Sequence, residues 1–191
     1  MRYDRERVVQ QMRKWENYLN EHALPSWEEL PALELYMDQV VALVNSYLGF
    51  LPKEVGLDSV VTAAAVNNYV RKKIMPPPVK KRYSRIHLAY LLMICSLKQC
   101  VSISYIQQMI PLNLSEQAVH DIYNTFVAHQ RRASLYFVEQ VNQVASNLLA
   151  ECQTADEGVS NMVTAFAVVS GLSRMAAEKL ILMQEPEKSE K

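Results

Sequence analysis

The feature that most limits the fold is a long stretch without helix breakers in the C-terminal third. Residues 116–152 contain no Gly or Pro, and Ser115 suits an N-cap. Apolar residues follow mostly in steps of three and four, the spacing of one helix face: Val119, Ile122, Phe126, Ala133, Phe137, Val141, Val144, Leu148 and Cys152. Such a helix measures about 55 Å. It cannot bury its apolar stripe alone.

A second apolar helix is predicted directly after the first. A turn is expected at 154–158, and the next helix at 159–183 is apolar on most sides, through Met162, Phe166, Val169, Leu172, Leu180 and Met183. The two helices predict a hairpin that is too apolar to stay isolated. The simplest way to bury its apolar surface is to pack against a second copy of the chain. The alternative is that the hairpin packs against the rest of its own chain. Residues 185–191 are predicted to be a solvated tail.

Two amphipathic helices are predicted before this hairpin. The first spans residues 4–20, with Val8, Met12, Trp15 and Leu19 on one face. The second is expected to begin near Ser26, which has capping-box spacing to Glu29, and to have its body at 33–48. Its apolar stripe is Leu33, Tyr36, Met37, Val40, Val41, Val44 and Leu48, and Gly49, Pro52 and Gly56 predict a turn after it.

The charges are unevenly distributed along a chain whose formal net charge is zero. No Asp or Glu occurs between Asp58 and Glu116, whereas eight basic residues do: Arg71, Lys72, Lys73, Lys80, Lys81, Arg82, Arg85 and Lys98. A block of this kind attracts polyanions, because Lys and Arg near phosphates release condensed counterions. Nucleic acid is therefore the leading predicted partner, and an acidic protein or anionic lipid is the alternative.

A short helix with a polar outer face is predicted inside the basic block. It begins near Ser59 or Thr62 and runs to about Lys73, with Val66, Val70 and Ile74 turned inward. This leaves Asn67, Asn68, Arg71 and Lys72 facing out, and amide and guanidinium groups suit base edges and phosphates. Helix, tight turn and short polar helix is the pattern of a helix-turn-helix, whose second helix enters the major groove.

A small β wing is predicted after this helix. Three prolines at 76–78 stop the helix, and residues 79–83 alternate too briefly for more than a small strand. Lys80, Lys81 and Arg82 at its tip would lie over the phosphate backbone or a minor groove. A buried helix with Leu88, Leu91, Ile94 and Leu97, and a short turn with Ile106 and Ile110, are expected to brace the wing.

The order of these motifs resembles the MerR-type winged helix-turn-helix regulators. The resemblance is carried by residues 66–69, 74–77 and 81–83, by the helix stripe from Leu88 to Leu97, and by Ser102, Ile103 and Ile106. Lys73 stands where those regulators usually have Gly, Asn67 where they often have Arg, and Cys100 where Gly is common. Residues 24–27 and 67–70 also resemble a bacterial family of predicted regulators known only as a domain of unknown function. The resemblance implies a homodimer on a palindromic operator, with recognition helices about one DNA turn apart.

Motifs for catalysis or metal binding are not evident. Cys95 and Cys100 are five positions apart, unlike a zinc-binding pair, and Cys95 lies in an apolar run, where free Cys acts as a small hydrophobe. The four histidines, at 22, 87, 120 and 129, are scattered, and there is no Gly-rich phosphate loop or nucleophile elbow. We expect no enzyme activity, cofactor or metal. The most apolar stretch, 162–173, is shorter than the ~20 residues of a membrane span.

The sequence thus predicts an all-α cytoplasmic protein with no secretory leader and no disulfide framework. Its expected parts are an N-terminal helix (1–25), a MerR-like winged helix-turn-helix domain with a small β wing (26–113), a dimerising helical hairpin (114–184) and a tail (185–191). We expect a homodimeric transcriptional regulator that binds double-stranded DNA sequence-specifically. The DNA-binding residues are predicted to be Thr62, Asn67, Asn68, Arg71, Lys72, Lys80, Lys81, Arg82 and Arg85.

Three other interpretations remain open at this level. A helical adaptor would use the basic face to bind an acidic protein or anionic lipid. RNA binding is disfavoured because Tyr83 is the only aromatic residue of the wing. A small-molecule effector pocket lined by Met162, Met175, Met183 and Phe166 is also open, although a Met and aromatic stripe is more often core.

Overall fold

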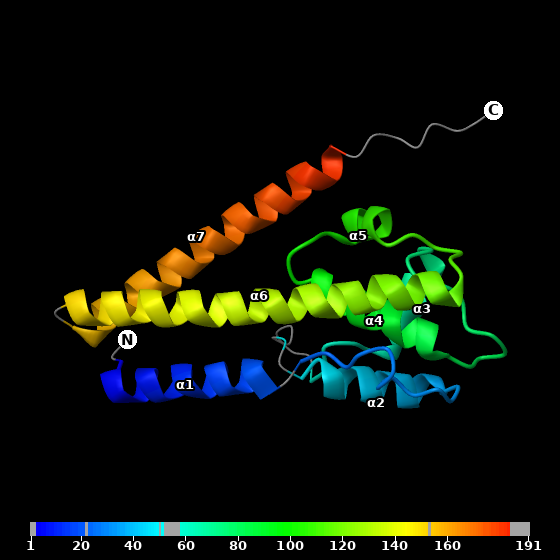
Figure 1. Cartoon of the computed structure of the whole chain (residues 1–191), viewed down its shortest axis with the longest axis horizontal. Helices are drawn as coiled ribbons and strands as arrows, with labels where there is room; N and C mark the ends of the chain where they lie inside the picture. The colour runs from blue at the N-terminus through cyan, green and yellow to red at the C-terminus, as the bar shows by residue number, and fades with distance from the viewer. Residues whose placement is uncertain (1–2, 22, 50, 52–57, 153, 184–191) are drawn as a thin grey trace.

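The computed structural model describes residues 3–21, 23–49, 51, 58–152 and 154–183, and this part of the chain is all-helical (Figure 1). It contains seven helices and no strand: α1 (Arg5–Glu21), α2 (Met37–Tyr47), α3 (Ala63–Arg71), α4 (Arg85–Leu97), α5 (Ile103–Met109), α6 (Glu116–Glu151) and α7 (Ala155–Leu182). The all-α prediction is confirmed. The predicted tail at 185–191 lies outside the described residues. None of the described helices is both long and apolar enough to cross a bilayer.

Helix α4 forms the centre of the main hydrophobic core. All nine residues from His87 to Cys95 are buried, so the helix is covered on every side. This fits its sequence, since a helix that is apolar all round belongs inside a domain. Helix α2 and the first half of α6 pack against it. The predicted buried positions Leu88, Leu91 and Ile94 are confirmed, and Leu97 is half-buried.

Helix α6 runs along the long axis of the molecule and connects its two ends (Figure 1). Its 36 residues correspond to about 54 Å, as the breaker-free sequence predicts. Its first half covers α4, whereas α1 runs antiparallel to its second half (Figure 1). The apolar stripe is therefore covered unequally: Val119 and Tyr123 are buried, whereas Phe137 is 50% exposed.

Helix α7 begins earlier than predicted. Thr154 is its N-cap, with Oγ1 accepting a hydrogen bond from the Glu157 N–H at 3.2 Å, so the expected turn at 154–158 is the first helical turn. Thr at the N-cap and acidic residues in the first turn both stabilise a helix start. The N-terminal part packs on α1 through Val159 and Met162. The helix then diverges from α6, and its C-terminal end reaches α5, where Ile181 is buried (Figure 1).

The prediction of a helix from Ser26 through residues 33–48 is wrong at its start. Ser26 and Glu29 do exchange hydrogen bonds, from Ser26 N–H to Glu29 Oε2 at 2.6 Å and from Glu29 N–H to Ser26 O at 3.2 Å. They close a turn instead of capping a helix. Helix α2 begins only at Met37, and Leu33, a predicted stripe residue, is 77% exposed.

An antiparallel bridge explains the late start of α2. Leu35 N–H donates to Tyr83 O at 2.8 Å, and Tyr83 N–H donates to Leu35 O at 2.9 Å. The backbone at Leu35 is therefore paired with a segment 48 positions away instead of being helical. Tyr36 follows as the N-cap, and its side chain is 52% exposed.

The tight turn predicted between two consecutive helices is also wrong. Residues 48–62 separate α2 from α3, which is longer than the three or four residues of a helix-turn-helix turn. Asn45 ties the end of this connection to α2. Its Oδ1 accepts from the N–H groups of Val60 (2.8 Å) and Val61 (3.1 Å), and its Nδ2 donates to Val61 O (2.9 Å). The predicted turn markers Pro52 and Gly56 lie outside the described residues.

Candidate nucleic-acid interface

Helix α3 begins at Thr62, one of the two predicted caps, and not at Ser59. Thr62 Oγ1 accepts a hydrogen bond from the Ala65 N–H at 3.2 Å, which satisfies one of the free donors at the helix start. Val66 and Tyr69 are buried and anchor the helix on the core. Thr62 therefore has a structural role at this site, and it is half-buried.

The outer face of α3 carries the predicted polar residues. Asn67, Arg71 and Lys72 are exposed, and Asn68 is half-buried. Asn68 Oδ1 accepts a hydrogen bond from Arg71 Nη2 at 2.8 Å. This contact orients the guanidinium along the helix surface and leaves its remaining donors, together with the two amide groups, for a ligand.

The C-terminus of α3 closes in a Schellman motif. Lys73 N–H donates to Val70 O at 3.0 Å, and Ile74 N–H donates to Tyr69 O at 2.9 Å. Lys73 occupies the left-handed position of the motif with φ 55°. The chain then turns inward through Ile74, which is buried. From α5, Gln107 Nε2 donates to the carbonyls of Lys72 (3.4 Å) and Lys73 (3.5 Å) and braces this turn.

His87 fixes the proline segment that follows. It is buried, its Nδ1 accepts from the Ser84 N–H at 3.0 Å, and its Nε2 is 3.1 Å from Pro77 O. The two contacts are compatible with a neutral ring that carries its proton on Nε2. Burial lowers the pKa of His87 below its usual value, with the Pro77 and Ser84 hydrogen bonds and the nearby Glu34 acting in the opposite direction. The ring thereby holds Pro77 against the start of α4.

The segment predicted as a β wing is a two-residue hairpin, which we call the basic hairpin (residues 79–82). Val79 N–H donates to Arg82 O at 3.1 Å, and Arg82 N–H donates to Val79 O at 2.9 Å. Lys80 and Lys81, at its tip, both have positive φ angles of 49° and 63°. Positive φ at both central residues matches a type I′ turn. In the described chain this region has only isolated bridges and no strand, because the paired segments are too short.

Two of the three predicted arginines, Arg82 and Arg85, lie beside aromatic rings. The guanidinium carbon of Arg82 is 3.7 Å from the centroid of Tyr36, a cation–π contact that steadies the charge next to the hairpin. The guanidinium carbon of Arg85 is 5.6 Å from the ring centroid of the buried Trp27. Arg85 is half-buried, and its Nε has no hydrogen-bond partner among the described residues. The Arg85 side chain packs toward the core, whereas the side chains of the hairpin lysines are exposed to solvent.

Four exposed lysines contribute half of the eight basic residues of this block. Lys72, Lys73, Lys80 and Lys81 are exposed, and no carboxylate of the described residues pairs with them. Lys98 is different, because its Nζ donates to Val60 O at 3.1 Å and ties α4 to the segment before α3. The connection between α3 and α4 lies at the opposite end of the long axis from the α6–α7 turn (Figure 1). The basic segment thus forms one end of the molecule.

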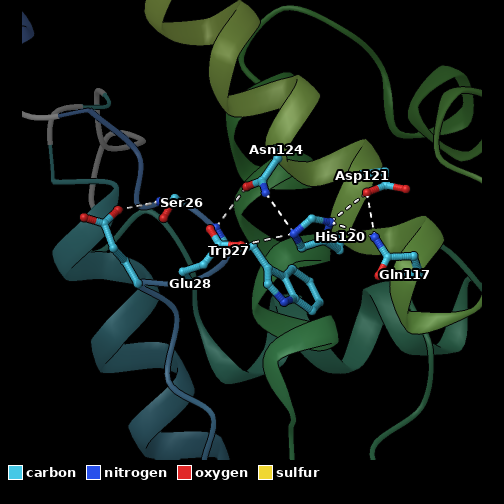
Figure 2. Close-up of polar contacts among 8 residues, drawn as sticks. Ser26, Trp27, Glu28, Gln117, His120, Asp121 and Asn124 are labelled. Atoms are coloured by element: carbon cyan, nitrogen blue, oxygen red, sulfur yellow. Dashed lines mark hydrogen bonds and ion pairs between the residues drawn. The ribbon is translucent and has the colours of Figure 1, made fainter.

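A polar cluster that the sequence did not indicate lies on α6 (Figure 2). His120 Nε2 is 3.1 Å from Glu28 Oε1, and its Nδ1 is 2.7 Å from Asp121 Oδ1. The hydrogen bond to Asp121, followed by that to Glu28, raises the pKa of His120. Asn124 Oδ1 accepts from the Trp27 N–H at 3.0 Å. The cluster fastens residues 26–28 to α6, and no local motif could reveal partners 92 positions apart.

The cysteines and the predicted effector residues do not form a shared site. Cys95 is buried in the core as expected, and burial raises its pKa to about 11, whereas Cys100 is exposed. In the described segments, no three His, Cys, Asp or Glu side chains are grouped as a metal ion requires. Met162 and Phe166 line a groove against α1, but Met175 and Met183 are exposed. Met162 and Met183 are about 31 Å apart along α7, so the predicted pocket is not assembled.

Comparison with protein families matches residues 25–126 to a domain of unknown function, DUF1836. The match runs from the segment before α2 to the first part of α6, and it includes the whole candidate interface. Helix α1, the rest of α6 and α7 lie outside it. Searches of curated proteins and of solved structures give no match. Because the matched region covers more than half of its length, this chain belongs to the DUF1836 family.

Proposed function

We propose that this protein binds double-stranded DNA through α3 and the basic hairpin, and that it is a homodimeric transcriptional regulator. In this proposal α3 and the basic hairpin take the places of the recognition helix and the wing of MerR-like winged helix-turn-helix regulators, with a longer connection before α3 than the tight turn of that motif. One observation carries the proposal. A short helix with exposed amide and guanidinium groups is followed by an exposed lysine hairpin, within 57 residues that contain no carboxylate side chain. DNA offers base edges to the first element and phosphates to the second.

The two elements have different roles in this proposal. Helix α3 enters the major groove, where Asn67 and Asn68 can bond to adenine and Arg71 to guanine or a nearby phosphate. Lys72 and the hairpin lysines contact the sugar-phosphate backbone, which positions the protein without selecting sequence. Arg82, steadied by Tyr36, supports the same backbone contact.

The exposed apolar face of α7 supports a homodimer. Large apolar residues along this helix are about half exposed or more: Val163, Val168, Val169, Leu172, Met175, Leu180 and Leu182. On α6, Leu135 and Tyr136 are also more than half exposed. Single exposed apolar residues are normal, but a continuous run over a helix of 28 residues marks an interaction surface.

A second copy of the chain is the simplest partner of matching apolar chemistry for the exposed face of α7.

Recovery of bound fragments from sheared genomic DNA tests the proposal. Purified full-length protein is incubated with the fragments in 0.1 M salt, and the bound DNA is sequenced. We expect a recurring palindrome whose half-sites are about one helical turn apart, because a dimer presents two α3 helices related by twofold symmetry. Enrichment of no sequence, together with equal binding to an acidic protein or to anionic vesicles, would favour the adaptor and contradict the regulator.

A further inference from the structure

We infer that Lys73, Lys80 and Lys81 are phosphate-binding residues at backbone positions that otherwise favour Gly or Asn, which adds Lys73 to the DNA-contacting set. The inference rests on the proposed function and names three of its contacts. Among the described residues, only four other than Gly have positive φ angles: these three lysines and Asn113. Asn tolerates the left-handed region because its short polar side chain can bond locally, whereas Lys has no such advantage.

Lys73 occupies the position after the α3 C-cap. Both hydrogen bonds of the Schellman motif are present there, and Ile74 completes it by entering the core. Gly is the usual residue at this position because it has no Cβ to meet the preceding backbone. A cation near a helix C-terminus is favoured by the helix dipole, but Arg71 and Lys72 already supply that charge.

Lys80 and Lys81 occupy the two central positions of a turn that fits type I′. Asn-Gly, Asp-Gly and Gly-Gly are strongly preferred in such turns, because both residues need positive φ. The hairpin is closed by hydrogen bonds from Val79 and Arg82, so the lysine side chains are not required to close it. Both lysines are exposed.

Hydrogen bonds to the backbone hold the turn at Lys73, including the one from Gln107, but the side chains of the three lysines make no contact within the described chain that would offset the backbone strain. None of them forms an ion pair with a described carboxylate, and none of their side chains donates a hydrogen bond to a described residue. Strained backbone of this kind is concentrated at functional sites, where the side chain acts on a ligand. Three unpaired ammonium groups can bind phosphodiester anions. Duplex DNA presents such anions at regular spacing along each strand.

Substitution of these lysines by the residues that the backbone favours tests the inference. The variants are Lys73→Gly, the pair Lys80→Asn with Lys81→Gly, and all three changes together. We expect Tm to rise by about 2–4 °C for each position at which the strain is relieved. This is the shift in Tm that about 1 kcal/mol of added stability produces in a protein of this size. We expect affinity for a random 30-bp duplex at 0.15 M salt to fall about fivefold per lysine, and the slope of log K against log salt to fall by about 0.9 per lysine.

Two matched controls separate charge from backbone. Replacement of the same three lysines by Arg keeps both charge and strain, so wild-type affinity and Tm are expected. Lys14→Gln removes an exposed lysine from regular helix in α1, and the salt slope should stay unchanged.

The outcomes distinguish this inference from the proposed function. A wild-type protein that does not bind the duplex even in 50 mM salt would overturn both. If the wild type binds the duplex, and the glycine and asparagine variants bind it with the same affinity and the same salt slope as the wild type, the assignment of the three lysines is wrong. The proposed function would then still stand. A fall in Tm in the correctly folded variants would show that the lysines stabilise the turns, which also contradicts it.

Discussion

At the scale of single residues, His87 determines where the basic hairpin can lie. Its ring connects Pro77, which precedes the hairpin, to Ser84, which follows it, and stacks edge-on against Tyr83 at 5.4 Å between centroids. The ring can make both hydrogen bonds only when it is neutral, because a protonated Nδ1 could no longer accept from Ser84. Protonation of His87 would therefore remove one of the two hydrogen bonds that position the hairpin.

We expect acid to destabilise the protein through His87. Its folded-state pKa is lowered by burial, so the unfolded chain takes up a proton first as pH falls. The contribution to stability is fully present above about pH 6.5 and is lost as pH falls from there through the folded-state pKa. His120 has a raised pKa and acts in the opposite sense, with a contribution that is lost as pH rises.

Thermal unfolding between pH 5 and 8 measures this effect. His87→Asn should cost about 1 kcal/mol at pH 7.5, because the donor to Pro77 O is lost, and its Tm should depend less on acid than that of the wild type. His129→Asn, at an exposed position on α6, is the control and should keep the wild-type acid dependence. An equally steep loss in His87→Asn below pH 6.5 would rule out His87 as the titrating group.

A second residue-scale prediction concerns Asn68. Its side chain orients Arg71 through a 2.8 Å hydrogen bond, so Asn68→Ala removes one possible base contact and loosens another. We expect a loss of about 1–3 kcal/mol in discrimination at one or two positions of the binding site, with little change in binding to random DNA. Lys72→Ala should lower affinity for all duplexes alike. Competition binding against single-base variants of the recovered site measures both, and equal losses on all sequences in Asn68→Ala would contradict a role in base recognition.

Some residue roles were predictable from the sequence, and others were not. Thr62 is a cap and Cys95 is core, because each role depends on neighbours within a few positions. Ser26 and Glu29 have the spacing of a cap but form a turn, since the same two hydrogen bonds fit either structure. The partners of His120 and the bridge between Leu35 and Tyr83 depend on contacts across the fold, for which local spacing contains no signal.

At the scale of whole elements, prediction succeeded where the hydrophobic periodicity is long. Helix α6 and the buried helix α4 follow from many mutually consistent positions. Short elements were less certain, because a few residues satisfy several structures equally well. The segment 79–83 was too short to distinguish a strand from a two-residue turn, and only the φ angles of Lys80 and Lys81 settle it.

The exposed face of α7 leads to a prediction about oligomeric state. Leu172 is 55% exposed on this helix, and Leu172→Glu would place a charge in the proposed interface, which is costly to bury unpaired. We expect the wild type to have the mass of a dimer by light scattering and the variant to shift toward the monomer at micromolar concentration. Circular dichroism should show unchanged helix content. Ser160→Glu, at an exposed polar position of α7, is the control and should remain dimeric.

Two results would contradict this assignment. If the wild-type protein has the mass of a monomer even at high concentration, the α7 face does not bind a second copy of the chain. A Leu172→Glu variant that remains a dimer would place the interface elsewhere on the chain.

At the scale of the whole molecule, the basic end and the apolar hairpin are parts of one elongated structure. The α3–α4 connection lies at one end, and α6 extends from there to the turn before α7 (Figure 1). Such an arrangement lets a dimer formed along the hairpins hold two basic ends at a fixed separation. The sequence indicates the charge and the helices, but the spacing of the two ends depends on how the copies pack.

Lysine footprinting measures whether α3 and the basic hairpin contact DNA. The protein is acetylated with a lysine-reactive reagent, with and without saturating duplex DNA in low salt, and each lysine is quantified by mass spectrometry. We expect DNA to protect Lys72, Lys73, Lys80 and Lys81, whereas the exposed Lys14 and Lys179 should remain reactive. Equal protection of all six, or protection confined to Lys14 and Lys179, would contradict this contact.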